Sequence, residues 1–285
     1  VGLERAVAGG ASGGGSDCAG GASAGGAAAL REIEELTASA AAPAGAPAVA
    51  AGPVPAHAPR AACAEALRRA LLADGLPARW LPLYERRAFA FRAGGDGGHD
   101  FGAVLAQALG GALDTLHSHA QGPPPPPLQH ALRCAGAAIA PAQRKAGKAA
   151  WVASDARSRF LELYRDFVRR VILPRVDLAG SGRCVFQAEP TIRVVFPSSR
   201  AGGRPRCDAE YFHQPGELTF LVPCCGGAEA MLHVAETPAE VGDEPGDFTP
   251  LAAAPGECAS FCGHRLAYGP APNDSGRCRV FFLFH

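Results

Sequence analysis

The C-terminal third of the chain alternates between short apolar segments and turns rich in glycine and proline. Five of these segments have the period-two alternation, or the β-branched and aromatic composition, that is typical of strands. They are Thr191–Phe196, Glu217–Val222, Ala230–Ala235, Cys258–Cys262 and Cys278–Phe284. Short strands separated by such turns predict an antiparallel barrel or sandwich.

The part of the chain before this region is predicted to be helical. The strongest pattern covers residues 151–176, where large apolar side chains recur at helical spacing and Pro174 is expected to end the helix. Shorter apolar stripes predict a helix from about residue 61 to Gly75, and another over residues 101–117. The predicted fold class is therefore α+β, mainly β, with N-terminal helices packed on a β core.

Residues 1–60 are rich in alanine, glycine and proline and contain few large apolar side chains. Such a segment cannot bury enough apolar surface to offset its conformational entropy, so we expect it to be mostly disordered. One helical patch is expected within it, over Ala29–Leu36, where leucine and isoleucine recur at helical spacing. The predicted organisation is a low-complexity segment 1–60, a helical region 61–180 and a β core 181–285.

The overall charge argues against several classes of partner. Lysine plus arginine and aspartate plus glutamate both number 27, which gives a net charge of +0. Nucleic acids and anionic membranes select a basic excess, so we expect neither as a partner. The sequence also has no apolar run of about 18 residues, the length at which a membrane-spanning helix becomes a candidate.

Ten cysteines are scattered along the chain without a Cys-x-x-Cys pair. This favours reduced thiols over a zinc ribbon or a disulfide framework, and the expected location is the cytoplasm. Whether a targeting segment precedes this sequence is left open, because the sequence begins at Val1 rather than at a methionine.

A run of prolines from Pro123 to Pro127 predicts a polyproline II segment. Segments of this kind bind SH3-like or WW-like domains, or serve as stiff surface inserts. The sequence leaves both interpretations open.

Several phrases in the β region, in a fixed order, resemble a known family. They are Pro190-Thr-Ile-Arg-Val194, Arg206-Cys-Asp-Ala-Glu-Tyr-Phe-His-Gln-Pro-Gly-Glu-Leu-Thr-Phe220, Gly246-Asp-Phe-Thr-Pro250 and Asn273-Asp-Ser-Gly-Arg-Cys-Arg-Val-Phe281. They are similar to phrases of the iron(II)/2-oxoglutarate-dependent dioxygenases, and more narrowly of the streptomycin-biosynthesis-like branch of small-molecule oxygenases. The resemblance covers about residues 184–285. It implies a double-stranded β-helix, or jelly-roll barrel, which agrees with the strand pattern.

The resemblance also implies a set of site residues. The family holds iron(II) with a His-x-Asp pair and a distant histidine, and a basic residue on the last strand pairs with 2-oxoglutarate. Carried over by position, Asp208 is the carboxylate ligand, and Arg279 and Thr219 are the co-substrate contacts. The two histidine positions are Arg206 and Tyr268, eleven residues before Arg279.

Arginine does not ligate metals, because its guanidinium group stays protonated. We therefore expect Arg206 to pair with Asp208 or Glu210 and to fill the place of the metal. Tyrosine is a poor ligand for ferrous iron, which puts Tyr268 in doubt. His264 is the candidate replacement, provided that a turn shortens the roughly 13 Å that four extended residues would span.

Two other histidines are not expected to bind metal. His213 matches a histidine that the family has in addition to its ligands. His233 would share a strand face with Met231 and Ala235, which indicates core packing.

Two functions follow from these observations. The first is an enzyme that oxidises or hydroxylates a small molecule, using iron(II) and decarboxylating 2-oxoglutarate. The second is a catalytically inactive relative that keeps the barrel as a binding or scaffold domain. The family resemblance favours the first and the substituted ligands favour the second, since fold and activity are separate properties.

Overall fold

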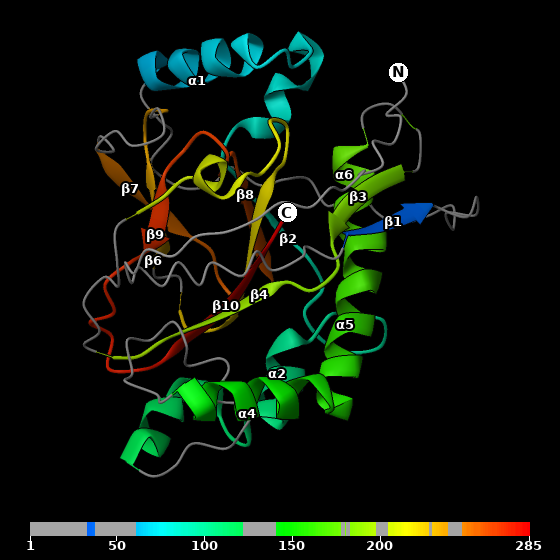
Figure 1. Ribbon diagram of the computed structural model, residues 1–285, viewed down its shortest axis with the longest axis vertical. Helices are drawn as coiled ribbons and strands as arrows, with labels where there is room; N and C mark the ends of the chain where they lie inside the picture. The colour runs from blue at the N-terminus through cyan, green and yellow to red at the C-terminus, as the bar shows by residue number, and fades with distance from the viewer. Residues whose placement is uncertain are drawn as a thin grey trace, which may run out of the picture. The chain divides into compact units, whose positions relative to one another are not determined.

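The fold consists of a helical layer, a five-stranded antiparallel sheet and a three-stranded antiparallel sheet (Figure 1). It is seen in a computed structural model, which describes residues 33–37, 61–121, 141–177, 180, 183–197, 205–227, 230–238 and 247–285. The described elements all belong to one unit, residues 32–285.

The two sheets face each other across a shared apolar core. The larger has the order β2 (Arg87–Ala90), β8 (Glu257–Phe261), β5 (Thr219–Cys225), β10 (Arg279–Phe284) and β4 (Thr191–Val195). The smaller has the order β7 (Phe248–Ala252), β6 (Ala230–Ala235) and β9 (Tyr268–Pro270). A separate antiparallel pair joins β1 (Ile33–Thr37) to β3 (Arg183–Gln187).

The helices cover the outer face of the larger sheet and one end of the structure. They are α1 (Ala61–Ala73), α2 (Phe101–Leu109), α4 (Pro141–Val152), α5 (Asp155–Phe167) and α6 (Leu173–Val176), with a π-helical segment Val168–Ile172 between the last two. The described 3-10 helices are η1 (Ala78–Tyr84), η2 (Leu113–Gln121) and η5 (Asp208–Tyr211). Figure 1 shows α2 and α5 on one side of the larger sheet and the strands β6, β7 and β9 on the other.

Strand β10 divides the core in two because its side chains alternate between the two faces. Val280, Phe282 and Phe284 belong to the core shared with α2 and α5. Phe281 and Leu283 belong to the core between the two sheets. A strand that is covered on both faces has a continuous apolar sequence, and this explains why nearly every residue of β10 is apolar.

Aromatic packing holds α5 against the larger sheet. The ring of Phe282 lies 4.8 Å from Phe101 and 5.4 Å from Phe160, centroid to centroid, with both pairs edge to face. Tyr164 meets Phe284 in the same way at 5.2 Å. At the start of α5, the hydroxyl of Ser154 accepts a hydrogen bond from the backbone N–H of Arg157 and caps the helix.

All five strands predicted from the sequence are confirmed, with shifts of up to three residues at their ends. Strands β2, β3, β7 and β9 were not predicted. The shortest, Tyr268-Gly-Pro270, carries no alternation that could reveal it, and pairing with β6 is what makes it a strand.

Three helix predictions need correction. The patch Ala29–Leu36 was expected to be helical, but Ile33–Thr37 forms a strand because it pairs with β3. The helix expected over residues 101–117 ends at Leu109, since Gly110 adopts a left-handed conformation, φ 78°. Pro174 was expected to end the helical region but does not, because it lies in the first turn of α6, where a missing backbone N–H costs little.

The polyproline segment Pro123–Pro127 and most of residues 1–60 lie outside the described residues. Among the described helices, none is both long and apolar enough to cross a membrane.

We predict that Phe282→Ala destabilises the protein by about 3–5 kcal/mol, because it removes a fully buried ring from the junction of α2, α5 and β10. Val185→Ala, at a position 63% exposed, is the matched control and is expected to change stability by less than about 0.5 kcal/mol. Urea unfolding of both variants measures the difference. A loss below about 1 kcal/mol for Phe282→Ala would contradict the packing described here.

Candidate metal centre

The candidate site is built around the buried carboxylate of Asp208, which is only 4% exposed. Its Oδ1 accepts a hydrogen bond from the hydroxyl of Tyr268 at 2.6 Å, and its Oδ2 accepts one from the hydroxyl of Thr219 at 2.8 Å. The backbone N–H of Asp208 donates to the carbonyl of Gly263 at 2.7 Å. A buried carboxylate without such donors would be costly, so these hydrogen bonds fix both the position and the orientation of Asp208.

Gly263 leaves the space that this arrangement needs. A Cβ at residue 263 would overlap both Asp208 Oδ2 and Thr219 Oγ1. Only glycine lets the loop after β8 approach the carboxylate so closely.

Two histidines complete a possible ligand cluster. His285 follows β10, and its Nδ1 lies 3.5 Å from Asp208 Oδ2 and 3.4 Å from Thr219 Oγ1. His213 follows η5, and its ring centroid is 4.2 Å from that of His285. Asp208, His213 and His285 each offer one ligand atom, and these three atoms all lie within 4.8 Å of one another.

Glu217 orients His213. Its Oε2 is in contact with Nδ1 of His213, and its Oε1 accepts a hydrogen bond from the backbone N–H of Gln214 at 2.8 Å. Burial opposes ionisation of Glu217, but the hydrogen bonds from His213 and Gln214 outweigh it and lower the pKa of the carboxyl group. Since Nδ1 of His213 faces a carboxylate, Nε2 is the nitrogen left for a metal.

Tyr268 keeps its proton in this environment. Burial, together with the neighbouring charge of Asp208, raises the pKa of the Tyr268 hydroxyl well above its usual value. The hydroxyl therefore donates to Asp208 rather than acting as a phenolate. Its ring packs edge to face on Phe261 at 5.1 Å.

Arg206 differs from its prediction. It was expected to form an ion pair with Asp208 or Glu210, but its side chain is exposed and its Nη1 donates to the hydroxyl of Tyr211 at 2.8 Å. Its backbone instead pairs with that of Tyr268, with N···O distances of 3.1 and 3.0 Å. The guanidinium remains in water because two neutral hydroxyl groups already satisfy Asp208, and burying a cation there would cost desolvation energy.

His264 lies next to Gly263 but outside the ligand cluster. It is 7% exposed, and its Nδ1 is buried without a hydrogen-bond partner. Burial and the nearby charge of Arg265 lower the pKa of its imidazole. The carbonyl of Gly263, the residue before His264, accepts from the N–H of Asp208, but the candidate ligand atoms that come together are those of Asp208, His213 and His285.

Arg279 lies away from the cluster, at the far end of β10. It is six residues before His285, which corresponds to about 20 Å along a strand. Its buried guanidinium donates through Nη1 to the carbonyl oxygens of Ala230 at 2.8 Å and Pro272 at 2.9 Å. The structure therefore brings together Asp208, Thr219 and Tyr268 of the predicted residues, but not Arg279.

Sequence reasoning missed His285 and dismissed His213. One signal was available for His285, because residues 281, 283 and 285 alternate onto the same face of the last strand. No comparable signal existed for His213, whose position depends on the tight turn from Asp208 to His213.

That turn is strained at Phe212. The residue has φ 63°, a left-handed conformation, and its side chain is 89% exposed. A bulky residue in this conformation is an outlier, and such strain is concentrated at functional sites. The N–H of Phe212 donates to the carbonyl of Ala209 and that of His213 to the carbonyl of Asp208, so the turn holds both candidate ligands in place.

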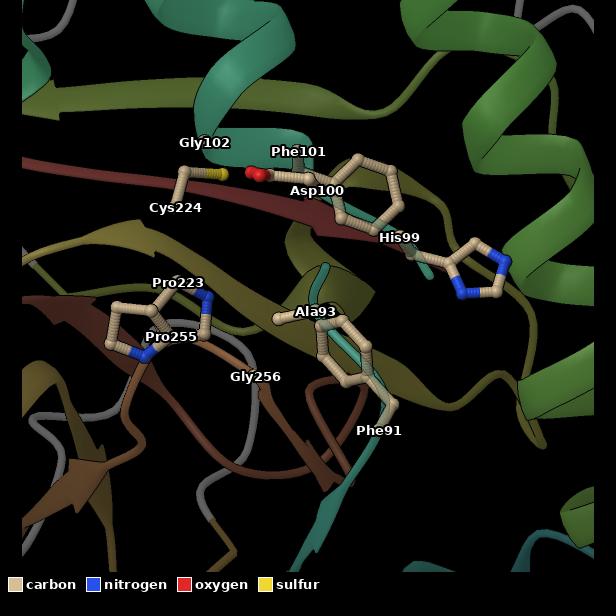
Figure 2. Close-up of a pocket in the computed structure, with 10 residues that line it drawn as sticks. All are labelled: Phe91, Ala93, His99, Asp100, Phe101, Gly102, Pro223, Cys224, Pro255 and Gly256. Atoms are coloured by element: carbon tan, nitrogen blue, oxygen red, sulfur yellow. The ribbon is translucent and has the colours of Figure 1, made fainter. Parts of the chain in front are cut away.

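A second feature lies on the helix-covered side of the larger sheet, where a small pocket is lined by Phe91, His99, Phe101 and Cys224 among others (Figure 2). His99 Nε2 is 3.0 Å from Asp166 Oδ2 of α5, and burial lowers the pKa of the imidazole. Burial also raises the pKa of the Cys224 thiol, so the sulfur stays protonated and is a poor nucleophile.

Comparison with solved structures finds similar chains, among them EvdMO1 and a bacterial prolyl-4-hydroxylase. No family model matches the sequence, and no curated protein matches it. The chain is similar to EvdMO1, with 16% identity and a TM-score of 0.25 over 50% of this chain and 32% of that one, so it spans about a third of the length of EvdMO1. It is also similar to a prolyl-4-hydroxylase of Pseudomonas putida, with 12% identity and a TM-score of 0.30 over 76% of this chain and 97% of that one.

We predict that Phe212→Gly leaves the stability unchanged or raises it by up to about 1 kcal/mol, because glycine adopts the left-handed conformation without strain and no packing is lost. Phe212→Ala, which keeps the strain, is the control and should show no gain. Urea unfolding compares the two. Destabilisation by more than about 1 kcal/mol in the glycine variant would show that Phe212 is needed for folding.

Proposed function

We propose that this chain is an oxidoreductase of the iron(II)/2-oxoglutarate-dependent dioxygenase type with a jelly-roll core. In this proposal Asp208, His213 and His285 hold the iron, and the reaction is the oxidation or hydroxylation of a small molecule. The observation that carries it is the convergence of two imidazoles and one carboxylate from η5, the following turn and the end of β10.

The chemistry of the donor set supports ferrous iron. Two histidines and one carboxylate, with the remaining coordination positions open, are typical of non-haem iron(II) oxygenases. Two atoms bound to one ion at about 2.1 Å are at most about 4.2 Å apart. The candidate ligand atoms, within 4.8 Å of one another, would therefore move closer by side-chain rotation on binding a metal.

Neighbouring groups support the ligands as they do at other metal sites. Glu217 holds the ring of His213 through Nδ1, a carboxylate–histidine arrangement that fixes the tautomer and leaves Nε2 for the metal. Thr219 and Tyr268 hold the carboxylate of Asp208.

Each residue has a separate role in such a centre. When bound, iron supplies the redox chemistry that couples oxygen to the decarboxylation of 2-oxoglutarate. Asp208 contributes charge to hold the cation, and Tyr268 keeps its proton on the hydroxyl beside it. The loop at Gly263 closes over the carboxylate and keeps water from one side of it.

A second function, that of an inactive binding domain, is favoured by one specific observation. Both oxygens of Asp208 already accept hydrogen bonds from hydroxyl groups. A carboxylate satisfied in this way is stable without a cation, and Arg206 and Tyr268 stand where the family has histidines.

We predict that the full chain binds one equivalent of iron(II) under anaerobic conditions, measured by calorimetric titration. His213→Ala, His285→Ala and Asp208→Asn are each expected to weaken binding by at least about tenfold, because each removes one of three ligands. His264→Ala is the matched control and should leave the affinity within about twofold. Loss of binding in His264→Ala, with none in His285→Ala, would reassign the ligand.

An assay of turnover distinguishes the active dioxygenase from the inactive binding domain. With iron and 2-oxoglutarate added, the enzyme is expected to show a weak visible charge-transfer band and to release succinate. Iron binding without either signal would support the inactive binding domain, and no iron binding would overturn the proposed function.

We further predict that Glu217→Gln lowers the iron affinity by about 10- to 100-fold without removing a ligand, because His213 loses the carboxylate that orients it. Glu257→Gln, at a carboxylate on β8 remote from His213 in sequence, is the control for a general loss of charge. Circular dichroism of both variants checks the fold. An unchanged affinity in Glu217→Gln would show that His213 needs no such partner.

A further inference from the structure

Two aromatic side chains are exposed on the turn between the candidate ligands Asp208 and His213. Tyr211 is 48% exposed and Phe212 is 89% exposed. Tyr211 is the last residue of η5, which begins at Asp208. Side chains three residues apart eclipse each other in a 3-10 helix, so Tyr211 lies on the same side of η5 as the Asp208 carboxylate. The two rings therefore border the metal centre and face water.

Phe212 adopts a strained conformation that its own packing does not offset. Its backbone is left-handed, with φ 63°, a conformation that glycine adopts without cost. The exposed ring buries little surface in return. Strain of this kind is concentrated at functional sites, including the contacts that hold a ligand. The conformation of Phe212 therefore indicates a ring that is kept for contact with a ligand.

An exposed cation stands beside these rings. The guanidinium carbon of Arg206 lies 5.8 Å from the centroid of the Tyr211 ring, and Nη1 donates to the Tyr211 hydroxyl at 2.8 Å. The backbone of Arg206 pairs with that of Tyr268 in an antiparallel bridge. Opposite side chains of such a pair project to the same face, so Arg206 leaves the chain on the side of Tyr268, whose hydroxyl contacts Asp208. Among the described residues no carboxylate pairs with Arg206, so Nε and Nη2 remain as donors.

Other exposed apolar side chains in the described part of the chain lack this setting. Leu72 on α1, Val152 on α4 and Val185 on β3 lie on separate elements. Single exposed apolar side chains are ordinary on protein surfaces and require no ligand. Tyr211 and Phe212 differ because they adjoin each other, an exposed cation and a candidate metal ligand.

We propose that Arg206, Tyr211 and Phe212 form the substrate-binding rim of the metal centre, and that the substrate class is a small aromatic carboxylic acid. This inference rests on the proposed function, since the metal supplies the oxidation and the rim selects the molecule. The guanidinium fork of Arg206 matches a carboxylate, and the ring of Phe212 offers an apolar face on which an aromatic ring packs. Arg206, which stands where the family has a histidine, thus serves the substrate instead of the metal.

The binding test uses the metal-free full chain, so that the carboxylate of a probe has no metal to bind. Calorimetric titration compares 3-phenylpropionate with two matched probes: 3-phenylpropanamide, which keeps the ring but lacks the charge, and propionate, which keeps the charge but lacks the ring. The parent is expected to bind 3-phenylpropionate at least about threefold more tightly than either, because only this probe engages both Arg206 and Phe212. Equal affinities for the acid and the amide would overturn the inference.

Variants assign the two contacts. Arg206→Gln is expected to weaken binding of the acid by about 3- to 10-fold and to leave binding of the amide within about twofold, whereas Phe212→Ala weakens both by about 3- to 10-fold. Arg206→Lys is expected to recover part of the affinity for the acid. Arg169→Gln, at an exposed arginine of the π-helical segment, is the matched control and should leave both affinities within about twofold. Equal losses in Arg169→Gln and Arg206→Gln would show a general effect of charge and overturn the inference.

A paramagnetic metal locates the probe relative to the centre. The full chain is loaded with manganese(II), which carboxylate ligands suit, or with zinc(II) as the diamagnetic reference. The ring signals of 3-phenylpropionate in the NMR spectrum are expected to broaden with manganese and not with zinc, and to broaden less in Arg206→Gln and Phe212→Ala. Signals that manganese bound to the chain leaves unchanged would place the probe away from the centre and overturn its role as a substrate.

Two further outcomes separate this inference from the proposed function. If the parent binds neither iron nor manganese, the proposed function fails, and binding of 3-phenylpropionate that still depends on Arg206 and Phe212 would support the rim as an acid-binding site. Binding that depends on neither residue, or no binding at all, would overturn the rim. Self-association of the parent in the ultracentrifuge that Phe212→Ala abolishes would show an interface between copies of this chain and would also overturn the inference.

Discussion

The hydrogen bonds from Tyr268 and Thr219 to the buried carboxylate of Asp208 join three parts of the chain that are far apart in sequence. They link η5 to β5 in the larger sheet and to β9 in the smaller one. Loss of either donor would leave a buried charge short of one partner, a cost of about 1–3 kcal/mol. The same bonds hold the carboxylate in place beside the two histidines, so one residue is both a structural link and a candidate metal ligand.

The alternation of β10 connects this site to the rest of the fold. One face of the strand is packed against α2 and α5 by Phe282 and Phe284, which fixes the strand in the sheet. The other face continues through Phe281 and Leu283 to His285 at the site. The rigid aromatic core thereby sets the position of one candidate ligand, whereas His213 depends on a short, strained turn.

Much of the β core could be predicted from local sequence patterns, because alternation and turn residues act over a few neighbouring positions. The strand Tyr268-Gly-Pro270 could not, since only pairing with β6 makes it extended. At the site, position in a motif drew attention to Asp208, Thr219 and Tyr268, and the structure joins these three by hydrogen bonds. The hydrogen-bond partners of Arg206 and the approach of His213 to His285 depend on strand register and on the left-handed conformation of Phe212. The spacing of residues along the sequence reveals neither.

The most direct measurement is the anomalous diffraction of crystals of the full chain grown anaerobically with iron(II). A metal held as proposed gives a peak at about 2.0–2.2 Å from an oxygen of Asp208 and from one ring nitrogen each of His213 and His285. A peak coordinated by other residues, or crystals with iron present and no peak beside Asp208, would contradict the metal centre described here.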